Sequence, residues 1–229
     1  MNYARKVALV AGVFYLLTFV SIPTLALYGQ VHDPKYVVGP GPDTPVLVGA
    51  VLEWIVALSG IGTAVALWPV LRKQNQGLAL GFVTSRILEA ACIVVGIASL
   101  LSIVTLRQSG AGANTLGAAQ ALVAVYDRMF LFGQSLMPAV NALLLGSLLY
   151  QSRLVPRILP TLGLAGAPLL IATQVVILFG LIGRLSPVAA IGALPIALWE
   201  FSLGVWLVAR GFETSAQDKL LSRTEERNY

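Results

Sequence analysis

Charged residues are scarce in this sequence of 229 residues. Asp, Glu, Lys and Arg make up 11% of the chain, whereas 57% of the residues are hydrophobic and the mean hydropathy is +0.84. Soluble domains carry about a quarter charged residues. The composition therefore excludes an ordinary soluble domain and predicts a protein whose solvent is the lipid bilayer.

Histidine and lysine are missing from the apolar parts of the chain. The single histidine, His32, lies between two apolar segments, where we expect it to be solvated, and no lysine occurs inside an apolar segment. These absences exclude a pair of histidine haem ligands, an HExxH zinc site and a Ser-His catalytic pair within the membrane. A Schiff base on a buried lysine is excluded for the same reason.

Cysteine and nucleotide-binding motifs are equally sparse. Cys92 is the only cysteine, so no internal disulfide can form, and its apolar neighbours predict inert packing. Neither a GxxxxGK[ST] phosphate loop nor a glycine-rich dinucleotide motif is present. The sequence therefore implies no cofactor and no metal, and an enzyme of this sequence would have to work with carboxylates.

Long apolar runs occupy most of the chain. A helix needs about 20 apolar residues to cross a bilayer, and the alternating polarity of a membrane β-barrel is absent. We predict an all-α fold, a six-transmembrane-helix bundle over residues 1–211, followed by a polar cytoplasmic tail, 212–229, that is frayed or lies on the surface. The six predicted spans are 7–27, 46–71, 78–106, 117–150, 158–183 and 188–209.

Basic residues are distributed unequally between the two sides of the predicted bundle. The N-terminus, the second and fourth connections and the tail contain ten Lys and Arg, whereas the odd-numbered connections contain three. Because cytoplasmic loops carry the excess of basic residues, both termini are predicted to be cytoplasmic. The net charge of +5 is then explained by topology, and no nucleic-acid partner is needed to account for it. The expected partner is the lipid bilayer. The sequence leaves the oligomeric state open.

Six charged residues lie inside the predicted spans, where one charge at mid-bilayer costs about 2.5–3.5 kcal/mol. They therefore need partners. A helical rise of about 1.5 Å per residue places them at two depths. We predict a lower cluster of Arg86, Glu89 and Glu200 and an upper cluster of Glu53, Asp127 and Arg128.

The fourth span also carries a polar seam. Gln120, Asp127, Gln134 and Asn141 follow one another at intervals of seven, as expected along a helix contact. Pro138 in this span, and Pro195 in the sixth, should bend their helices. Gln134 and Asn141 join the six charged residues as candidate ligand- or ion-binding residues.

Three functions are compatible with these residues. In the first, buried carboxylates bind a small polar ligand, a cation or a proton, as in a transporter-like or receptor-like protein, because four acids face two arginines. In the second, the ion pairs only fix helix packing in a structural or regulatory partner. In the third, carboxylates catalyse a reaction on a lipid or quinone.

Four segments together resemble a family of bacterial multi-pass membrane proteins, domain of unknown function 4386. The segments are Gly12-Val-Phe-Tyr-Leu-Leu-Thr-Phe, Arg86-Ile-Leu-Glu-Ala, Ser152-Arg-Leu-Val-Pro-Arg and Pro195-Ile-Ala-Leu-Trp-Glu, the last continuing to Phe212. The resemblance lies in their order and spacing over residues 5–212. It implies a helical bundle in a bacterial cytoplasmic (inner) membrane and no particular activity.

Overall fold

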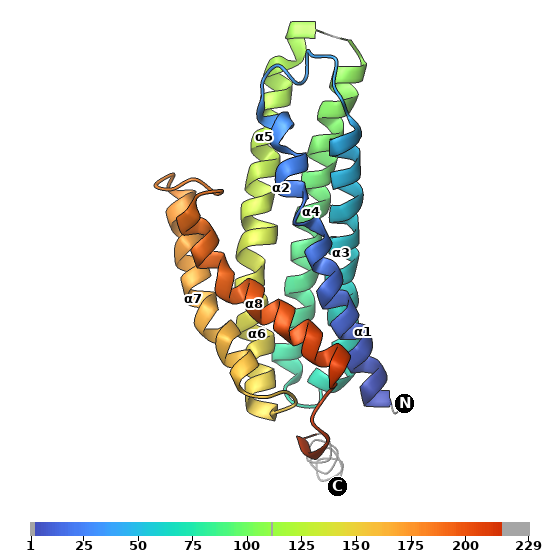
Figure 1. The fold of residues 1–229 in the computed structure, drawn as a ribbon, viewed down its shortest axis with the longest axis vertical. Helices are drawn as coiled ribbons and strands as arrows, with labels where there is room; N and C mark the ends of the chain where they lie inside the picture. Colours follow the sequence, from blue (N-terminus) through green and yellow to red (C-terminus); the bar gives the residue numbers. More distant parts are fainter. Residues whose placement is uncertain (1–2, 111, 217–229) are drawn as a thin grey trace.

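The computed structural model describes residues 3–110 and 112–216, and these residues form helices without a β-strand. Figure 1 shows an elongated bundle in which α1 begins and α8 ends at the same end, here called proximal; the other end is called distal. Six helical segments are long and apolar enough to cross a membrane. The chain is therefore an all-α multi-pass membrane protein, as the sequence predicted.

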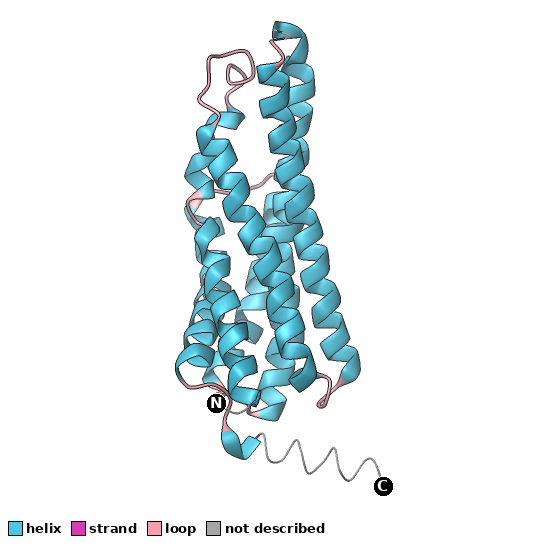
Figure 2. Ribbon diagram, turned by 90° about the vertical axis from the view of Figure 1, so that its right-hand side faces the viewer, coloured by secondary structure: helices cyan, strands magenta, loops and turns pink. Residues whose placement is uncertain are grey.

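The helices form a ring. α1 packs on α3, α3 on α4, α4 on α6, α6 on α7, α7 on α8, and α8 packs again on α1; α5 packs on α4. Figure 2 shows the same bundle from the side. The helix bounds are α1 Tyr3–Leu17, α2 Thr24–Leu27, α3 Thr44–Leu71, α4 Gln76–Gln108, α5 Leu116–Phe130, α6 Met137–Ser152, α7 Ile158–Leu178 and α8 Pro187–Ala209.

The helices differ in length, and this shapes the distal half. α4 has 33 residues, or about 50 Å at the α-helical rise. α7 and α8 have 21 and 23 residues, or about 32–35 Å, close to the thickness of a bilayer core. In Figure 1, α3, α4 and α5 accordingly extend well beyond the connection between α7 and α8, which leans away from them.

The largest apolar core lies where the ring of helices is closed, and it includes the fully buried side chains of Tyr15, Phe82 and Trp199. Gly163 on α7 allows the close approach of α8, because a Cβ atom there would lie 2.5 Å from the Trp199 ring. At the proximal end the Arg5 guanidinium donates to the carbonyl of Leu207 at 2.8 Å. It thereby satisfies a carbonyl that the end of α8 leaves without a helical partner.

The first predicted span is a single candidate membrane segment, but its helix is interrupted. α1 ends at Leu17, a 3₁₀ turn follows over Thr18–Ser21, and α2 is a single short helix after Pro23. Thr18 donates its hydroxyl to the Tyr15 carbonyl at 2.7 Å. Hydroxyl groups thus occupy carbonyls near the break, which is how irregular backbone is tolerated in a membrane.

The fourth predicted span is interrupted as well. A π-helical turn over Leu131–Leu136 separates α5 from α6, directly before Pro138, which has no N–H to donate back to the preceding turn. The interruption thus lies beside Pro138, and the bend predicted for this proline stays a prediction. Pro195, by contrast, lies inside the continuous helix α8.

The distal loop between α2 and α3 is held by one carboxylate. Asp43 accepts hydrogen bonds from the Tyr36 hydroxyl at 2.8 Å, from Arg107 Nε at 2.7 Å and from Gln108 Nε2 at 3.0 Å. The hydrogen bond from Arg107 is the main reason that the pKa of Asp43 is lowered to about 2. The loop is therefore tied to the end of α4.

The segment after α8 is described as far as Ala216. Phe212 and Ala216 are buried against the proximal core, and the Glu213 N–H donates to the Leu154 carbonyl at 2.9 Å. The segment 212–216 is therefore not frayed; it lies at the surface, with Glu213, Thr214 and Ser215 exposed. The rest of the predicted tail, 217–229, lies outside the described residues, and the domain boundary at 211 stays a prediction.

Candidate functional site

The predicted lower cluster is formed. Arg86 on α4 donates from Nη1 to Glu89 Oε2 at 3.0 Å and from Nη2 to Glu200 Oε1 on α8 at 3.1 Å. The spacing of three residues places Arg86 and Glu89 on the same face of α4, and α8 brings Glu200 to that face. One guanidinium is therefore shared by two carboxylates from two helices.

Three further side chains hold this cluster in place. Asn141 on α6 donates from Nδ2 to Glu89 Oε2 at 2.7 Å. The Arg86 guanidinium carbon lies 5.1 Å from the centroid of the Tyr15 ring and 5.7 Å from that of Phe82, distances at which an aromatic ring attracts a cation. Asn141 was predicted as a candidate from the polar seam, whereas Tyr15 was not predicted.

Burial differs between the guanidinium and its carboxylates. The Arg86 side chain is 2% exposed, the Glu89 side chain 9% and the Glu200 side chain 13%. Each carboxylate uses one oxygen for these hydrogen bonds. The two carboxylates of the cluster are therefore more exposed than the guanidinium that they share.

The predicted upper cluster is wrong as a single group. Glu53 on α3 is fully buried, and its Oε1 accepts from Gln134 Nε2 at 2.9 Å and from the Tyr126 hydroxyl at 3.4 Å. Among the described residues these partners are uncharged. Glu53 therefore belongs to a separate polar site, which the π-helical turn builds by directing Gln134 toward α3.

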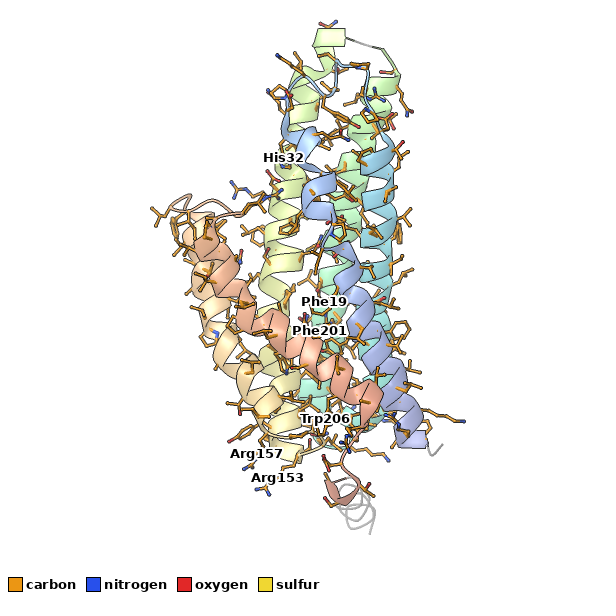
Figure 3. The ribbon with its side chains drawn as sticks, in the orientation of Figure 1. Phe19, His32, Arg153, Arg157, Phe201 and Trp206 are labelled. Atoms are coloured by element: carbon orange, nitrogen blue, oxygen red, sulfur yellow. The ribbon has the colours of Figure 1, made fainter. Side chains whose placement is uncertain are left out.

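Asp127, the second predicted acid of that cluster, pairs elsewhere. Its Oδ1 lies 2.7 Å from Arg184 Nη1, in the connection between α7 and α8, and 3.0 Å from His32 Nε2. The hydrogen bond to Asp127 is the main reason that the pKa of His32 is raised. The expectation that His32 is only solvated is wrong. Through its contact with Asp127, His32 links the α2–α3 loop to α5 beside Arg184 (Figure 3).

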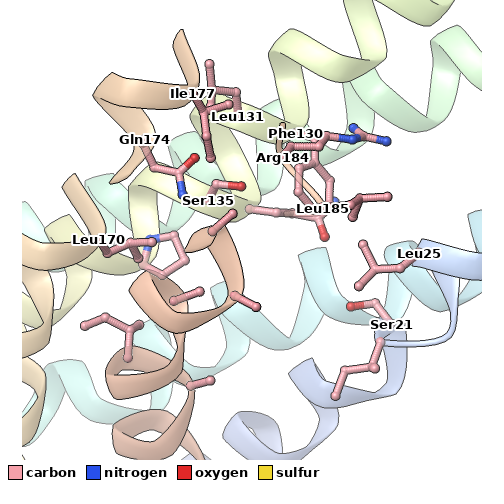
Figure 4. A pocket seen from close by; sticks show the side chains of 18 of the residues that line it. Ser21, Leu25, Phe130, Leu131, Ser135, Leu170, Gln174, Ile177, Arg184 and Leu185 are labelled. Carbon is pink, nitrogen blue, oxygen red and sulfur yellow. The ribbon is translucent and has the colours of Figure 1, made fainter. Parts of the chain in front are cut away.

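A cavity of about 780 Å³ extends from the lower cluster to the ion pair of Asp127 and Arg184. Arg86, Glu89 and Glu200 lie at its inner end, and Asp127 and Arg184 line it at the distal side. Figure 4 shows that its walls come from the broken first span, the π-helical turn, α7 and α8. Both irregular segments of backbone thus lie against the cavity, as irregular backbone in membrane proteins usually does.

Two other residues of the wall complete the cavity. Arg128, a predicted site residue, is exposed and lines the cavity without joining Glu53. Gln174 on α7 was not predicted, although an amide in an apolar span of 21 residues is itself a signal. It is 7% exposed, and its buried Oε1 has no hydrogen-bond partner among the described residues. The wall of the cavity therefore includes a buried amide oxygen that has no donor in the described part of the chain.

Comparison with known proteins identifies the family. The model of the family described as domain of unknown function (DUF4386) matches residues 10–211. The chain belongs to the DUF4386 family. The match covers all eight candidate residues, and the sequence resemblance to this family is thereby confirmed. No curated protein and no solved structure matches this DUF4386 member significantly.

Proposed function

We propose that this protein is a membrane-embedded binding protein, transporter-like or receptor-like, whose Arg86–Glu89–Glu200 cluster binds a positively charged species. The observation that carries the proposal is that two carboxylates share one guanidinium at the inner end of a cavity. When both carboxylates are ionised, the cluster has one negative charge in excess. A proton or another cation would compensate that charge, because an uncompensated charge in a low-dielectric site is unfavourable.

The alternative is that the cluster only fixes helix packing. It is favoured by the tight enclosure of Arg86 between Tyr15 and Phe82, since buried ion pairs can be purely architectural. The two functions differ in what happens when Glu200 is neutralised. A binding site would lose its excess negative charge, whereas an architectural ion pair would lose one of its two carboxylates.

The variant Glu200→Gln separates these functions. Its amide oxygen can still accept from Arg86 Nη2, so we expect the purified variant to be at least as stable to heating as the wild type. The unfolding temperature of the wild type should rise saturably with protons, Na⁺, K⁺, Mg²⁺ or choline, because a ligand that binds the folded state stabilises it. Glu200→Gln should not respond.

The matched control is Glu213→Gln, which removes an exposed carboxylate outside the cavity and should respond like the wild type. A wild type whose unfolding temperature is insensitive to every cation, together with a marked loss of stability in Glu200→Gln, would contradict binding. That result would favour the architectural alternative.

We also propose that the protein lies in the cytoplasmic (inner) membrane of a bacterium with the proximal end in the cytoplasm. Support comes from the resemblance of the four segments and from the ten-to-three distribution of basic residues. The distal cluster of His32, Asp127 and Arg184 would then lie toward the outer surface.

A further inference from the structure

We infer that the cavity binds an amphiphilic organic cation, with the positive group against Glu89 and Glu200 and an apolar body along the walls. This inference names the ligand class for the proposed function and rests on it. A proton or a metal ion would occupy a small part of about 780 Å³, whereas pockets of about 300–1,000 Å³ hold organic molecules of drug size. The volume therefore favours an organic ligand.

The walls match an apolar body. Large aliphatic side chains line the cavity over most of its length: Ile22, Leu25, Leu131, Leu170, Ile177 and Ile196. Ile22 and Leu25 are also among the exposed apolar side chains of the protein. The cavity therefore has an apolar flank on the surface that the bilayer would cover, and a ligand dissolved in the membrane could reach it there.

The position of that flank is fixed by two contacts. Phe19 and Phe201 meet edge to face with ring centroids 5.5 Å apart, joining the broken first span to α8 (Figure 3). Arg184 joins the α7–α8 connection to Asp127 farther toward the distal end. Between these contacts, the exposed Ile22 and Leu25 are part of the cavity wall.

The inner end selects for positive charge. Glu89 and Glu200 line this end and are more exposed than the arginine they share, so two carboxylates face one guanidinium there. Gln174, which lines the same cavity, adds an independent acceptor, because its buried Oε1 has no donor in the described part of the chain (Figure 4). A protonated amine offers both the charge for the carboxylates and N–H groups for this amide oxygen.

Apart from Arg86, which Glu89 and Glu200 share, the arginines of the cavity lie away from this end. Arg128 and Arg184 line the distal side together with Asp127, so the charge of the cavity is negative at its inner end and positive at its distal side. An anionic amphiphile would have to place its charge at the distal side, and a cationic one at the inner end. The unpartnered acceptor Gln174 and the excess of carboxylate favour the cation.

The test compares three probes with the same apolar body, a phenyl ring on four CH₂ groups: phenylbutylammonium, phenylbutanol and phenylpentanoate. Binding to the full-length protein in lipid nanodiscs is measured by equilibrium dialysis, with empty nanodiscs as the blank for partitioning into lipid. We expect saturable binding of the ammonium at least about tenfold tighter than that of the alcohol, or 1.4 kcal/mol, and no saturable binding of the carboxylate.

Three variants locate the site. Glu200→Gln should reduce the affinity for the ammonium to that for the alcohol, and Gln174→Leu should weaken it severalfold. Glu213→Gln should bind like the wild type. Ala193→Trp, which fills the cavity without changing its charge, should abolish binding of both the ammonium and the alcohol; thermal unfolding of each variant shows that it is folded.

Equal affinity for the three probes, or tighter binding of the carboxylate, would overturn the inference. If the wild type is nevertheless stabilised by inorganic cations or protons and Glu200→Gln is not, the proposed function stands and only the ligand class is wrong. If neither the probes nor those cations bind, both the ligand class and the proposed function are wrong.

Discussion

Arg86 is the residue on which the candidate site depends. It is 2% exposed and contacts Glu89, Glu200 and the Tyr15 ring, so two carboxylates and one aromatic ring meet at one guanidinium. When both acids are ionised, the positive charge of Arg86 is needed to compensate the two carboxylates to which it donates hydrogen bonds. The two acids, in turn, are held apart by the width of the guanidinium between them.

The first prediction concerns Arg86→Met, which keeps a long apolar side chain and removes the charge. Breaking a buried ion pair by removing one partner costs about 3–5 kcal/mol, because the other charge is left without compensation. We expect a large fall in unfolding temperature and in the yield of monodisperse protein. Arg72→Met, at an exposed position in the proximal turn, is the control and should change neither. Unaltered stability of Arg86→Met would show that the guanidinium does not hold the acids.

The second prediction concerns His32, whose pKa is raised by the hydrogen bond to Asp127. A group with a higher pKa in the folded state stabilises that state below its unfolded value of about 6.5, and the contribution is lost as pH rises through the folded value. The wild type should therefore be more stable than His32→Gln at pH 6, and this difference should shrink at alkaline pH. Thermal unfolding across this pH range measures it; a difference that grows with pH would contradict the assignment.

Individual residues show which part of the site the sequence could predict. Arg86, Glu89 and Glu200 could be grouped because depth along a helix follows from residue number alone. Glu53 and Asp127 also lie at the same predicted depth in the membrane, yet their side chains contact different neighbours. The direction in which a side chain points within the bundle depends on helix packing, which depth does not specify. Arg184 was counted as a loop residue, so the partner of Asp127 was missed.

At the scale of helices, small residues decide how closely neighbours approach. A Cβ atom at Gly12 on α1 would lie 2.8 Å from the Gly204 carbonyl oxygen and 2.9 Å from Leu207 Cβ on α8. The first of these is backbone and cannot turn away. α1 and α8 therefore meet through glycine, as closely packed membrane helices do.

The third prediction follows from this contact. Gly12→Ala should destabilise the protein by about 1–3 kcal/mol, because overpacking forces the helices apart. Gly117→Ala on α5 is the matched control, since nothing lies within 4 Å of the added Cβ, and it should leave stability unchanged or slightly raised. Chemical unfolding in detergent measures both variants. Equal stability of the two would mean that α1 and α8 can separate at no cost.

Helix continuity was the least predictable feature of the elements. Hydropathy defines where a span lies, and it placed all six, but it averages over the backbone and does not detect a break. In the first span, the run of Thr18, Ser21, Pro23 and Thr24 indicates the break. Proline has no N–H to bond a backbone carbonyl, and the threonine hydroxyls donate to backbone carbonyls there. The π-helical turn before Pro138 carries no signal beyond the proline itself.

At the scale of the whole molecule, the cavity results from a ring of helices that differ in length. The proximal core is shared by six helices, whereas a second core joins the α2–α3 loop to α3, α4 and α5 at the distal end. α7 and α8 do not reach that second core, and the cavity lies between them and α5. Such an arrangement depends on tertiary packing, so composition and periodicity alone do not predict it.

The fourth prediction concerns the orientation of the molecule. A fluorescent protein fused after residue 229 should fluoresce in a bacterial host, and alkaline phosphatase fused there should be inactive, because both termini are predicted to be cytoplasmic. Fusions placed in the distal loop at Gly39 should behave in the opposite way. Active phosphatase at the C-terminus would reverse the assignment of the two ends.

The most direct measurement is the reactivity of a thiol at the inner end of the cavity. In a Cys92→Ser background, Ala197→Cys lines the cavity one helical turn from Glu200, whereas Leu198→Cys is 50% exposed on the outer face of α8 and does not line it. A site for positive charge predicts that Ala197→Cys reacts with a membrane-impermeant cationic thiosulfonate faster than with an anionic one. Leu198→Cys should react with neither. Lack of reaction at Ala197→Cys in folded protein, with full reaction after unfolding, would contradict a cation-binding site at the inner end of the cavity.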